Sequence, residues 1–371
     1  MNFSKFRPEL KLAVFSLLST LVFWLTFSLN LPTRLGFPPS SMETLFANYD
    51  GPYYLVIAKC GYVPSCIATQ FALPTPLEYY PAHLPGYPLI IRTLDIFFTG
   101  PWAMLVATLL GTMLLSIIFY HFLRHYLSPK VSFWLSILLM FFPPRLLVLR
   151  LIGSPETWYL ASIVGSILFF LKQKYLPSAL LAVLAQSLKS PGILLPAAFF
   201  LSLLFQKKLS ARRFWPYLLV PLSVLLIFSL FGRDTGDFLA YFNSGDNIHL
   251  VAFPYAVFLS FRSWLGTIWL EDIIYLFFLI FIGLFLLRRY WPQPTFIFPL
   301  IYTLASIFVA HRDLSRYLAP VYPFMILAFA PYLRQKPVYY SLLLILPAVI
   351  LYAINFIIGN TAPIVNWTPY L

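Results

Sequence analysis

The chain has 371 residues, of which 60% are hydrophobic and 10% charged, and its formal net charge is +13. Soluble domains carry about 25% charged residues, so this composition excludes an ordinary soluble domain and is typical of a polytopic membrane protein. The basic residues lie in short gaps between apolar runs rather than in one basic region, so we expect no nucleic-acid partner.

The apolar runs predict an all-α polytopic membrane protein with about eleven transmembrane helices, taking about 20 apolar residues as one span. We interpret the whole chain, residues 1–371, as a single transmembrane domain. The first run is long for a signal peptide and lacks a small-residue cleavage site, which favours a retained anchor. The helices are expected near residues 11–30, 102–123, 131–149, 156–171, 176–189, 192–206, 214–231, 268–288, 293–310, 317–333 and 338–358.

The charge pattern predicts which side of the membrane each gap faces. Six gaps hold more than half of the 25 Lys and Arg residues, together with one acid, Glu9. By the positive-inside rule these gaps and the N-terminus are cytoplasmic, in a bacterial cell membrane or an endoplasmic reticulum membrane. The basic residues concerned are Lys5, Arg7, Lys11, Arg124, Lys130, Lys172, Lys174, Lys207, Lys208, Arg212, Arg213, Arg288, Arg289, Arg334 and Lys336.

The first loop, residues 31–100, is predicted to be extracytoplasmic and to carry the reactive carboxylate, Asp50. Asp50-Gly51-Pro52 is a helix-start signal and Gly61 is the matching stop, so a short helix is expected between them. On it, Asp50, Tyr53 and Tyr54 share one face. Asp50 is interpreted either as a helix cap or as a catalytic group, and one side chain can serve both roles.

The rest of this loop predicts an interfacial helix over residues 84–98, short and interrupted by Arg92 and Asp95. We interpret Arg92 as a side chain that reaches toward water from the membrane surface. Cys60 and Cys66 are the two cysteines of the chain. The sequence leaves open whether they form a disulfide or remain free thiols.

Several bases lie near predicted outer helix ends, where they are candidates for binding a phosphate group. Arg312 and Arg316 are four residues apart and suit a bidentate phosphate contact, although a local ion pair with Asp313 is an equal alternative. Lys189 and Arg150 are further candidates. We interpret Ser154-Pro155-Glu156 as helix-capping chemistry.

An outer-face carboxylate beside phosphate-binding bases predicts group transfer from a lipid-phosphate donor. Asp50 would accept a proton from an acceptor hydroxyl, while the bases stabilise the departing phosphate. Aromatic and imidazole side chains would shape the sugar or acceptor site, namely Tyr53, Tyr54, His83 and Tyr87. The alternative is a transporter or lipid flippase, which also breaks helices and buries charges. The chain contains no P-loop, dinucleotide-binding or HExxH motif.

Four motifs then indicate a family. The first-loop stretch Phe46–Tyr62 resembles the first-loop signature of the GPI mannosyltransferase 2 (PIG-V-like) family, and Tyr80-Pro81 through Tyr87-Pro88-Leu89-Ile90 resembles the segment that follows it. Ser154-Pro155-Glu156 is similar to the family's Ser-Glu helix start. Arg316-Tyr317-Leu318-Ala319-Pro320 is similar to its late Arg-Tyr-Leu-Pro motif.

This resemblance implies a GT-C type glycosyltransferase with the first-loop acid as base. The implied reaction is inverting transfer of a sugar, mannose in that family, from a polyprenyl-phosphate donor to a glycan, lipid or protein acceptor. The chain departs from the family pattern in two ways, because Pro52 replaces a small residue and no second acid adjoins Asp50. A paired-acid metal site is therefore unsupported, although a divalent metal stays open.

Overall fold

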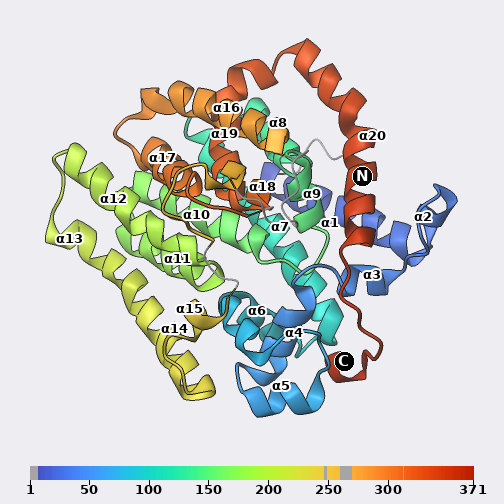
Figure 1. Cartoon of the computed structure of the whole chain (residues 1–371). Helices are drawn as coiled ribbons and strands as arrows, with labels where there is room; N and C mark the ends of the chain where they lie inside the picture. Colours follow the sequence, from blue (N-terminus) through green and yellow to red (C-terminus); the bar gives the residue numbers. More distant parts are fainter. Residues whose placement is uncertain (1–6, 246–248, 260–269, 312) are drawn as a thin grey trace.

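The computed structural model describes residues 7–245, 249–259, 270–311 and 313–371, and within these ranges the chain is helical, without a β-strand. Figure 1 shows the helices in one bundle, with α7, α10 and α11 at its centre. The α-helices are α1 (Pro8–Ser28), α2 (Leu31–Arg34), α3 (Met42–Phe46), α4 (Gly51–Cys60), α5 (Pro64–Gln70), α6 (Gly86–Leu94), α7 (Gly100–Arg124), α8 (Pro129–Leu139), α9 (Pro144–Leu149), α10 (Glu156–Leu171), α11 (Tyr175–Leu188), α12 (Leu194–Phe205), α13 (Ala211–Phe214), α14 (Leu219–Thr235), α15 (Ala240–Asn243), α16 (Leu270–Leu287), α17 (Pro294–Ser306), α18 (Leu314–Tyr317), α19 (Tyr322–Leu333) and α20 (Lys336–Gly359).

Among the described residues, five helical segments are long and apolar enough to cross a membrane: Pro8–Ser28, Gly100–Arg124, Ala211–Thr235, Leu270–Tyr290 and Lys336–Gly359. Five shorter apolar helices accompany them. The chain is therefore an integral membrane protein, as its composition predicts. Every predicted span contains a helix, and the one expected over residues 131–149 is divided into α8 and α9 by the Pro143-Pro144 turn. The number of spans, eleven, stays a prediction.

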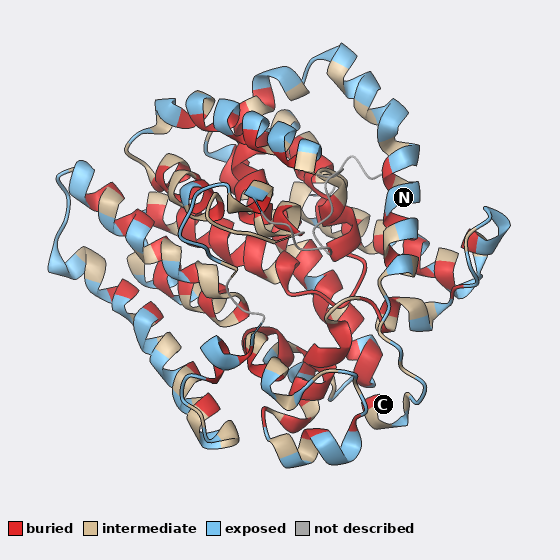
Figure 2. Cartoon of the chain, viewed as in Figure 1, coloured by how far each residue is buried: buried red, intermediate tan, exposed pale blue. Residues whose placement is uncertain are grey.

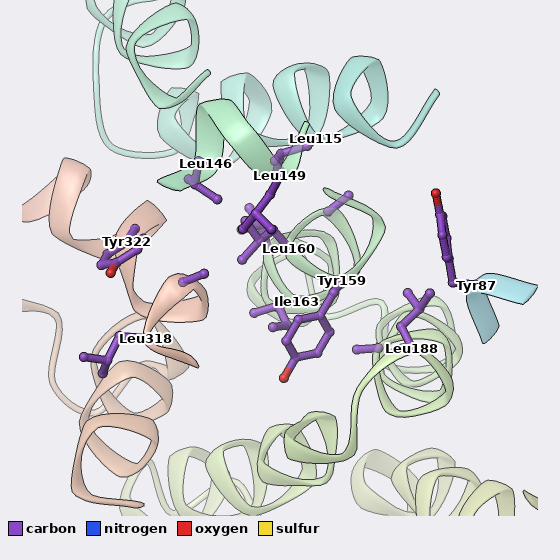
Figure 3. Packing of buried hydrophobic residues seen from close by; sticks show 14 of the residues in the cluster. Tyr87, Leu115, Leu146, Leu149, Tyr159, Leu160, Ile163, Leu188, Leu318 and Tyr322 are labelled. Carbon is purple, nitrogen blue, oxygen red and sulfur yellow. The ribbon is translucent and has the colours of Figure 1, made fainter. Parts of the chain in front are cut away.

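The core is built around α10, which packs against α11 and α7. Figure 2 shows buried residues concentrated in these central helices and exposed residues on the outer ones. Leu160 and Ile163 of α10 lie in the packed cluster with Leu115 of α7 and Leu149 of α9 (Figure 3). Because α10 is buried almost throughout, its two ends are held firmly in place.

Contacts join four of the six basic gaps at one end of the bundle. His121 near the end of α7 is 3.3 Å from Glu9 at the start of α1. The ring of Tyr126, after α7, is 4.6 Å from the ring of Tyr290, after α16, and the Phe205 and Trp291 rings are 4.8 Å apart. The structure thus gathers segments that the charge pattern predicts to be on one side. Which side of the membrane they face stays a prediction.

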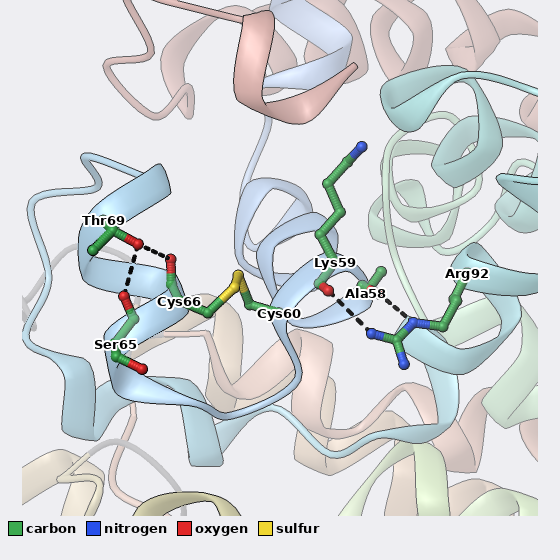
Figure 4. The surroundings of a disulfide bond; sticks show 7 residues. All are labelled: Ala58, Lys59, Cys60, Ser65, Cys66, Thr69 and Arg92. Atoms are coloured by element: carbon green, nitrogen blue, oxygen red, sulfur yellow. Dashed lines mark hydrogen bonds between the residues drawn. A yellow bond between two sulfur atoms is a disulfide. The ribbon is translucent and has the colours of Figure 1, made fainter.

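The predicted helix in the first loop is confirmed, because α4 starts at Gly51 and ends at Cys60, with Gly61 at φ 62°. Arg92 is exposed, in agreement with its interpretation as a side chain that reaches toward water, and it also contacts the end of α4. Its Nε donates to the Ala58 carbonyl at 2.6 Å and its Nη2 to the Lys59 carbonyl at 3.1 Å, so it satisfies carbonyls that the helix end leaves free (Figure 4).

A disulfide joins the end of α4 to α5. Cys60 and Cys66 are bonded, which settles the alternative that the sequence leaves open in favour of the disulfide (Figure 4). The first loop also contacts the segment after α20, where the Ala362 N–H donates to the Ala47 carbonyl at 2.8 Å and the Tyr49 N–H donates to the Asn360 carbonyl at 2.9 Å. The N-terminal side of α4 is therefore attached to the C-terminal part of the described chain.

Candidate active site

Asp50 lies at the N-terminal end of α4 without a side-chain capping hydrogen bond. Its carboxylate instead faces a guanidinium whose side chain is 11% exposed, and Arg316 Nη2 donates to Asp50 Oδ2 at 3.0 Å. His83 Nε2 is 3.9 Å from the other carboxylate oxygen, Oδ1. The capping interpretation of Asp50 therefore does not hold in this structure, and the carboxylate is directed at ionisable side chains from two other parts of the chain.

Arg316 of α18 is the centre of the charged group. While its Nη2 binds Asp50, its Nε donates to Glu156 Oε1 at 2.5 Å. The same Glu156 oxygen lies 2.7 Å from Lys189 Nζ, and the Glu156 side chain is only 2% exposed. The interpretation of Glu156 as part of a helix cap alone is therefore wrong, because its carboxylate holds both of the predicted phosphate-binding cations that the structure brings together.

The central helices place these side chains at the end of the bundle opposite to Lys172 and Lys174. Glu156 is the first residue of α10 and Lys189 directly follows α11, whereas Lys172 and Lys174 lie between the other ends of the same two helices. Close packing fixes the end of α11, since a Cβ on Gly86 would lie 2.6 Å from the Ser187 carbonyl oxygen. A glycine at this position of α6 lets the first loop approach the helix backbone.

A second charged group adjoins the first. Arg145 Nη2 is 2.5 Å from Asp313 Oδ2, and both side chains are at most 10% exposed. The Tyr49 hydroxyl donates to Asp313 and accepts from Arg145 Nη2. Asp313 thus pairs with Arg145, while its carboxylate is 4.0 Å from Arg316. The two groups together contain equal numbers of carboxylates and cations, namely Asp50, Glu156 and Asp313 with Arg316, Lys189 and Arg145.

Aromatic rings form one wall beside Asp50. His83 stacks on Tyr53 with ring centroids 5.5 Å apart and meets Tyr54 edge-on at 5.0 Å. Tyr87 lies behind Tyr54, with a ring distance of 5.1 Å, and its hydroxyl donates to the Met104 carbonyl at 2.9 Å. Three of the four predicted sugar- or acceptor-binding residues, Tyr53, Tyr54 and His83, therefore line the cavity. Tyr87 does not line it and packs behind Tyr54 in the core.

The charged groups open into one cavity of about 1110 Å³, which is large even for a ligand pocket. Its polar part is lined by the ionisable residues described above. Apolar side chains on one side of it come from α14, α15 and the start of α12, namely Val224, Phe228, Phe242 and Leu194. The cavity combines a buried charged centre with an apolar side, an arrangement that suits an amphipathic ligand with an anionic head.

One predicted phosphate-binding residue, Arg150, is not part of this arrangement. Arg150 is enclosed among α1, α8 and α9, where Nη1 donates to Thr20 at 2.9 Å and Nε to the Met140 carbonyl at 2.9 Å, and it does not line the cavity. Arg312 lies outside the described residues. Among the residues that are described, no group of three His, Cys, Asp or Glu side chains is arranged to hold a metal ion.

The surroundings of Asp50 control its ionisation. Burial by itself raises the pKa of Asp50, but the Arg316 guanidinium and the His83 side chain outweigh it and hold the pKa below its ordinary value. In the absence of a ligand, Asp50 is therefore an ionised but weak base. The neighbouring Tyr49 hydroxyl has its pKa raised, chiefly by burial, and stays protonated.

Fold and site together define an all-α integral membrane protein with a carboxylate and guanidinium centre in a large, partly apolar cavity. No protein-family model matches the sequence, and no curated protein matches it. The structure is similar to the crystal structure of ArnT from Cupriavidus metallidurans bound to undecaprenyl phosphate, with a TM-score of 0.51 and 16% sequence identity.

The alignment with ArnT covers 91% of this chain and 63% of that one, so this chain spans less than two thirds of the length of ArnT. At such low identity the likeness shows the fold. The chain therefore shares the overall fold of ArnT.

Proposed function

We propose that this protein is a GT-C type glycosyltransferase that moves a sugar from a polyprenyl-phosphate donor to an acceptor hydroxyl. The observation that supports it most strongly is the arrangement of Asp50, Arg316, Glu156 and Lys189 in one cavity with an apolar side. The fold supports it as well, since the similar ArnT structure contains undecaprenyl phosphate.

In the proposed reaction, the donor phosphate binds to Arg316 and Lys189, and its lipid chain lies along the apolar side of the cavity, formed by α12, α14 and α15. The acceptor hydroxyl transfers its proton to the Asp50 carboxylate as the oxygen attacks the anomeric carbon. The bond from that carbon to the phosphate oxygen breaks, and the two cations stabilise the leaving polyprenyl phosphate. Attack opposite the phosphate inverts the anomeric centre.

The ion pair between Asp50 and Arg316 explains how a weak base becomes strong enough. A donor phosphate competes with Asp50 for the Arg316 guanidinium, which removes part of the interaction that lowers the pKa of Asp50. Burial, which raises the pKa, then dominates. Donor binding thus prepares the base, and transfer is favoured only after the donor is in place.

The finer assignments rest on the motif resemblance. From the motifs around Asp50 and Arg316 we infer that the sugar is mannose and that the protein acts as a PIG-V-like mannosyltransferase. Tyr53, Tyr54 and His83 line the sugar or acceptor side. The reaction takes place at the extracytoplasmic face, with a glycan, lipid or protein as acceptor.

Reconstitution tests this function. The purified protein is placed in liposomes with undecaprenyl-phosphate-linked mannose, glucose or arabinose and a membrane extract as the source of acceptors, and mass spectrometry follows the carrier lipid. We expect free undecaprenyl phosphate to appear together with a glycosylated acceptor, most rapidly from the mannose donor. A donor that crosses the bilayer chemically unchanged would instead indicate a transporter or flippase.

A further inference from the structure

Tyr49, the residue before Asp50, adopts a backbone conformation that residues other than glycine rarely take. Its φ is 58°, in the left-handed region, where a bulky residue is strained. Two hydrogen bonds keep the backbone in this conformation. The Tyr49 N–H donates to the Asn360 carbonyl, and the side-chain amide of the preceding Asn48 donates to the Ile357 carbonyl at 2.5 Å. Such strain next to a reactive group requires an explanation from what the side chain does.

The Tyr49 ring covers the face of the Arg316 guanidinium. The Arg316 Cζ is 4.2 Å from the ring centroid, and the edges of the same guanidinium meet Asp50 and Glu156. An aromatic face attracts a cation and fixes the plane of the guanidinium. With one face covered, Arg316 keeps its edges directed at the carboxylates and at any phosphate that replaces them.

The Tyr49 hydroxyl fixes the ring in turn. It donates to Asp313 and accepts from Arg145 Nη2 at 3.0 Å, so the ring is tied to the second charged group. The ring also packs at 6.0 Å from Phe356 of α20. Tyr49 therefore links both charged groups of the cavity through a single side chain.

We propose that Tyr49 is a positioning residue that orients Arg316 toward Asp50 and toward the donor phosphate. The link to the phosphate rests on the function proposed above, whereas the link to Asp50 rests on the contacts alone. The ionisable groups that face or influence Asp50 are Arg316, His83, Lys189, Glu156, Tyr49, Tyr53 and Tyr54. Of these, Arg316 makes the shortest contact with it, and Tyr49 is the residue that orients Arg316.

The test is a pH titration of the Asp50 carboxyl by carbon-13 NMR in protein labelled at aspartate, with Asp50→Asn for assignment. Tyr49→Leu removes the ring, and because leucine is also strained at positive φ it leaves the backbone cost nearly the same. We expect the pKa of Asp50 to rise by about one unit or more, since a misplaced Arg316 leaves burial dominant. Tyr49→Phe keeps the ring and should cause a smaller rise.

Phe46→Leu is the matched control. Phe46 is an aromatic residue of the same loop as Tyr49, but its ring packs against Trp102 and Trp367 and does not line the cavity. It should leave the Asp50 titration unchanged. An unchanged titration in Tyr49→Leu, or an equal shift in Phe46→Leu, would overturn the positioning role and reduce Tyr49 to a packing residue.

Binding of undecaprenyl phosphate in detergent micelles separates this inference from the proposed function. Tyr49→Leu should weaken binding on the order of tenfold, the effect of losing one cation–π contact at a largely desolvated site. A wild-type protein that binds no undecaprenyl phosphate would contradict the proposed function, whereas the Asp50 titration would still decide the role of Tyr49.

Discussion

Asp50 and Arg316 form the ion pair on which the proposed chemistry depends, and their contact has a consequence for pH. Because the pKa of Asp50 in the folded protein is lower than the ordinary value of about 3.9, the carboxylate stays ionised as the pH falls and is protonated only in strong acid. We therefore expect no loss of kcat/KM from Asp50 between pH 7 and about pH 5, since this parameter reports groups of the free enzyme.

The measurement is a kcat/KM profile for sugar transfer, compared with the NMR titration of Asp50. An acid limb near neutral pH that coincides with protonation of Asp50 would show that Arg316 does not hold this carboxylate in the free protein.

Glu156 is the carboxylate on which the stability of the site depends most. Its side chain is 2% exposed and it compensates both Lys189 and Arg316. Glu156→Gln leaves Lys189 and Arg316, which are 27% and 11% exposed, with less negative charge, and loss of one partner of a fully buried ion pair costs about 3–5 kcal/mol, which is an upper limit here. We expect a clear fall in melting temperature in detergent, at neutral pH.

Glu43→Gln provides the control, because Glu43 is an exposed acid of the first loop. It should leave the melting temperature nearly unchanged. Equal melting temperatures for the Glu156 and Glu43 variants would mean that the buried charges are compensated by other groups.

Much of this site could be predicted from the sequence, and the reasons for the gaps are physical. Asp50 and Arg316 stood out because charge is rare in so apolar a chain. Glu156 was missed since an acid at a helix start has an adequate local explanation. The same rarity of charge makes Arg150 a candidate, yet its guanidinium donates to two hydroxyls and a carbonyl inside the bundle, away from the cavity, and its Nη2 has no hydrogen-bond partner. Sequence spacing contains no information on such distant partners.

At the scale of single elements, α4 shows how far local signals reach. Gly51-Pro52 and Gly61 define both of its ends, because a proline in the first turn and a glycine at positive φ are local backbone preferences. The contact of Arg92 with the carbonyls at its C-terminus is not local, since α6 must first pack against α4. Helix ends were therefore predictable, whereas the side chains that satisfy them were not.

The disulfide at the end of α4 gives a prediction for this element. Cys60 and Cys66 are six residues apart, and a loop this short gains about 2 kcal/mol from closure in the chain-entropy model. The double variant Cys60→Ser, Cys66→Ser should melt at a lower temperature yet keep its transfer activity, because neither cysteine lines the cavity. Loss of activity without a change in melting temperature would instead indicate a direct role in the reaction.

At the scale of the whole molecule, the positions of most helices followed from apolar length, whereas their packing order did not. The central place of α10 arises from its contacts with α7 and α11, which hydropathy does not reveal because lipid-facing and buried helices are similarly apolar. The charge pattern nevertheless predicts that the basic gaps share one side of the membrane, and the structure brings several of them to the same end of the bundle.

Orientation in the membrane is testable by cysteine labelling in the Cys60→Ser, Cys66→Ser background. Gln70→Cys in the first loop and Ser210→Cys between α12 and α13 introduce exposed thiols. The positive-inside rule predicts that a membrane-impermeant maleimide labels residue 70 in intact cells and residue 210 only after permeabilisation. The reverse pattern would place the cavity on the cytoplasmic side.

The central claim is that Asp50 is the base for sugar transfer, and the turnover of Asp50→Asn tests it most directly. The asparagine keeps the size of the side chain and an oxygen for Arg316 but cannot accept the proton, so we expect kcat to fall by about 10²- to 10⁴-fold. Glu78→Gln, which changes an exposed acid of the same loop, should keep wild-type turnover. Full turnover by a correctly folded Asp50→Asn protein would contradict the account.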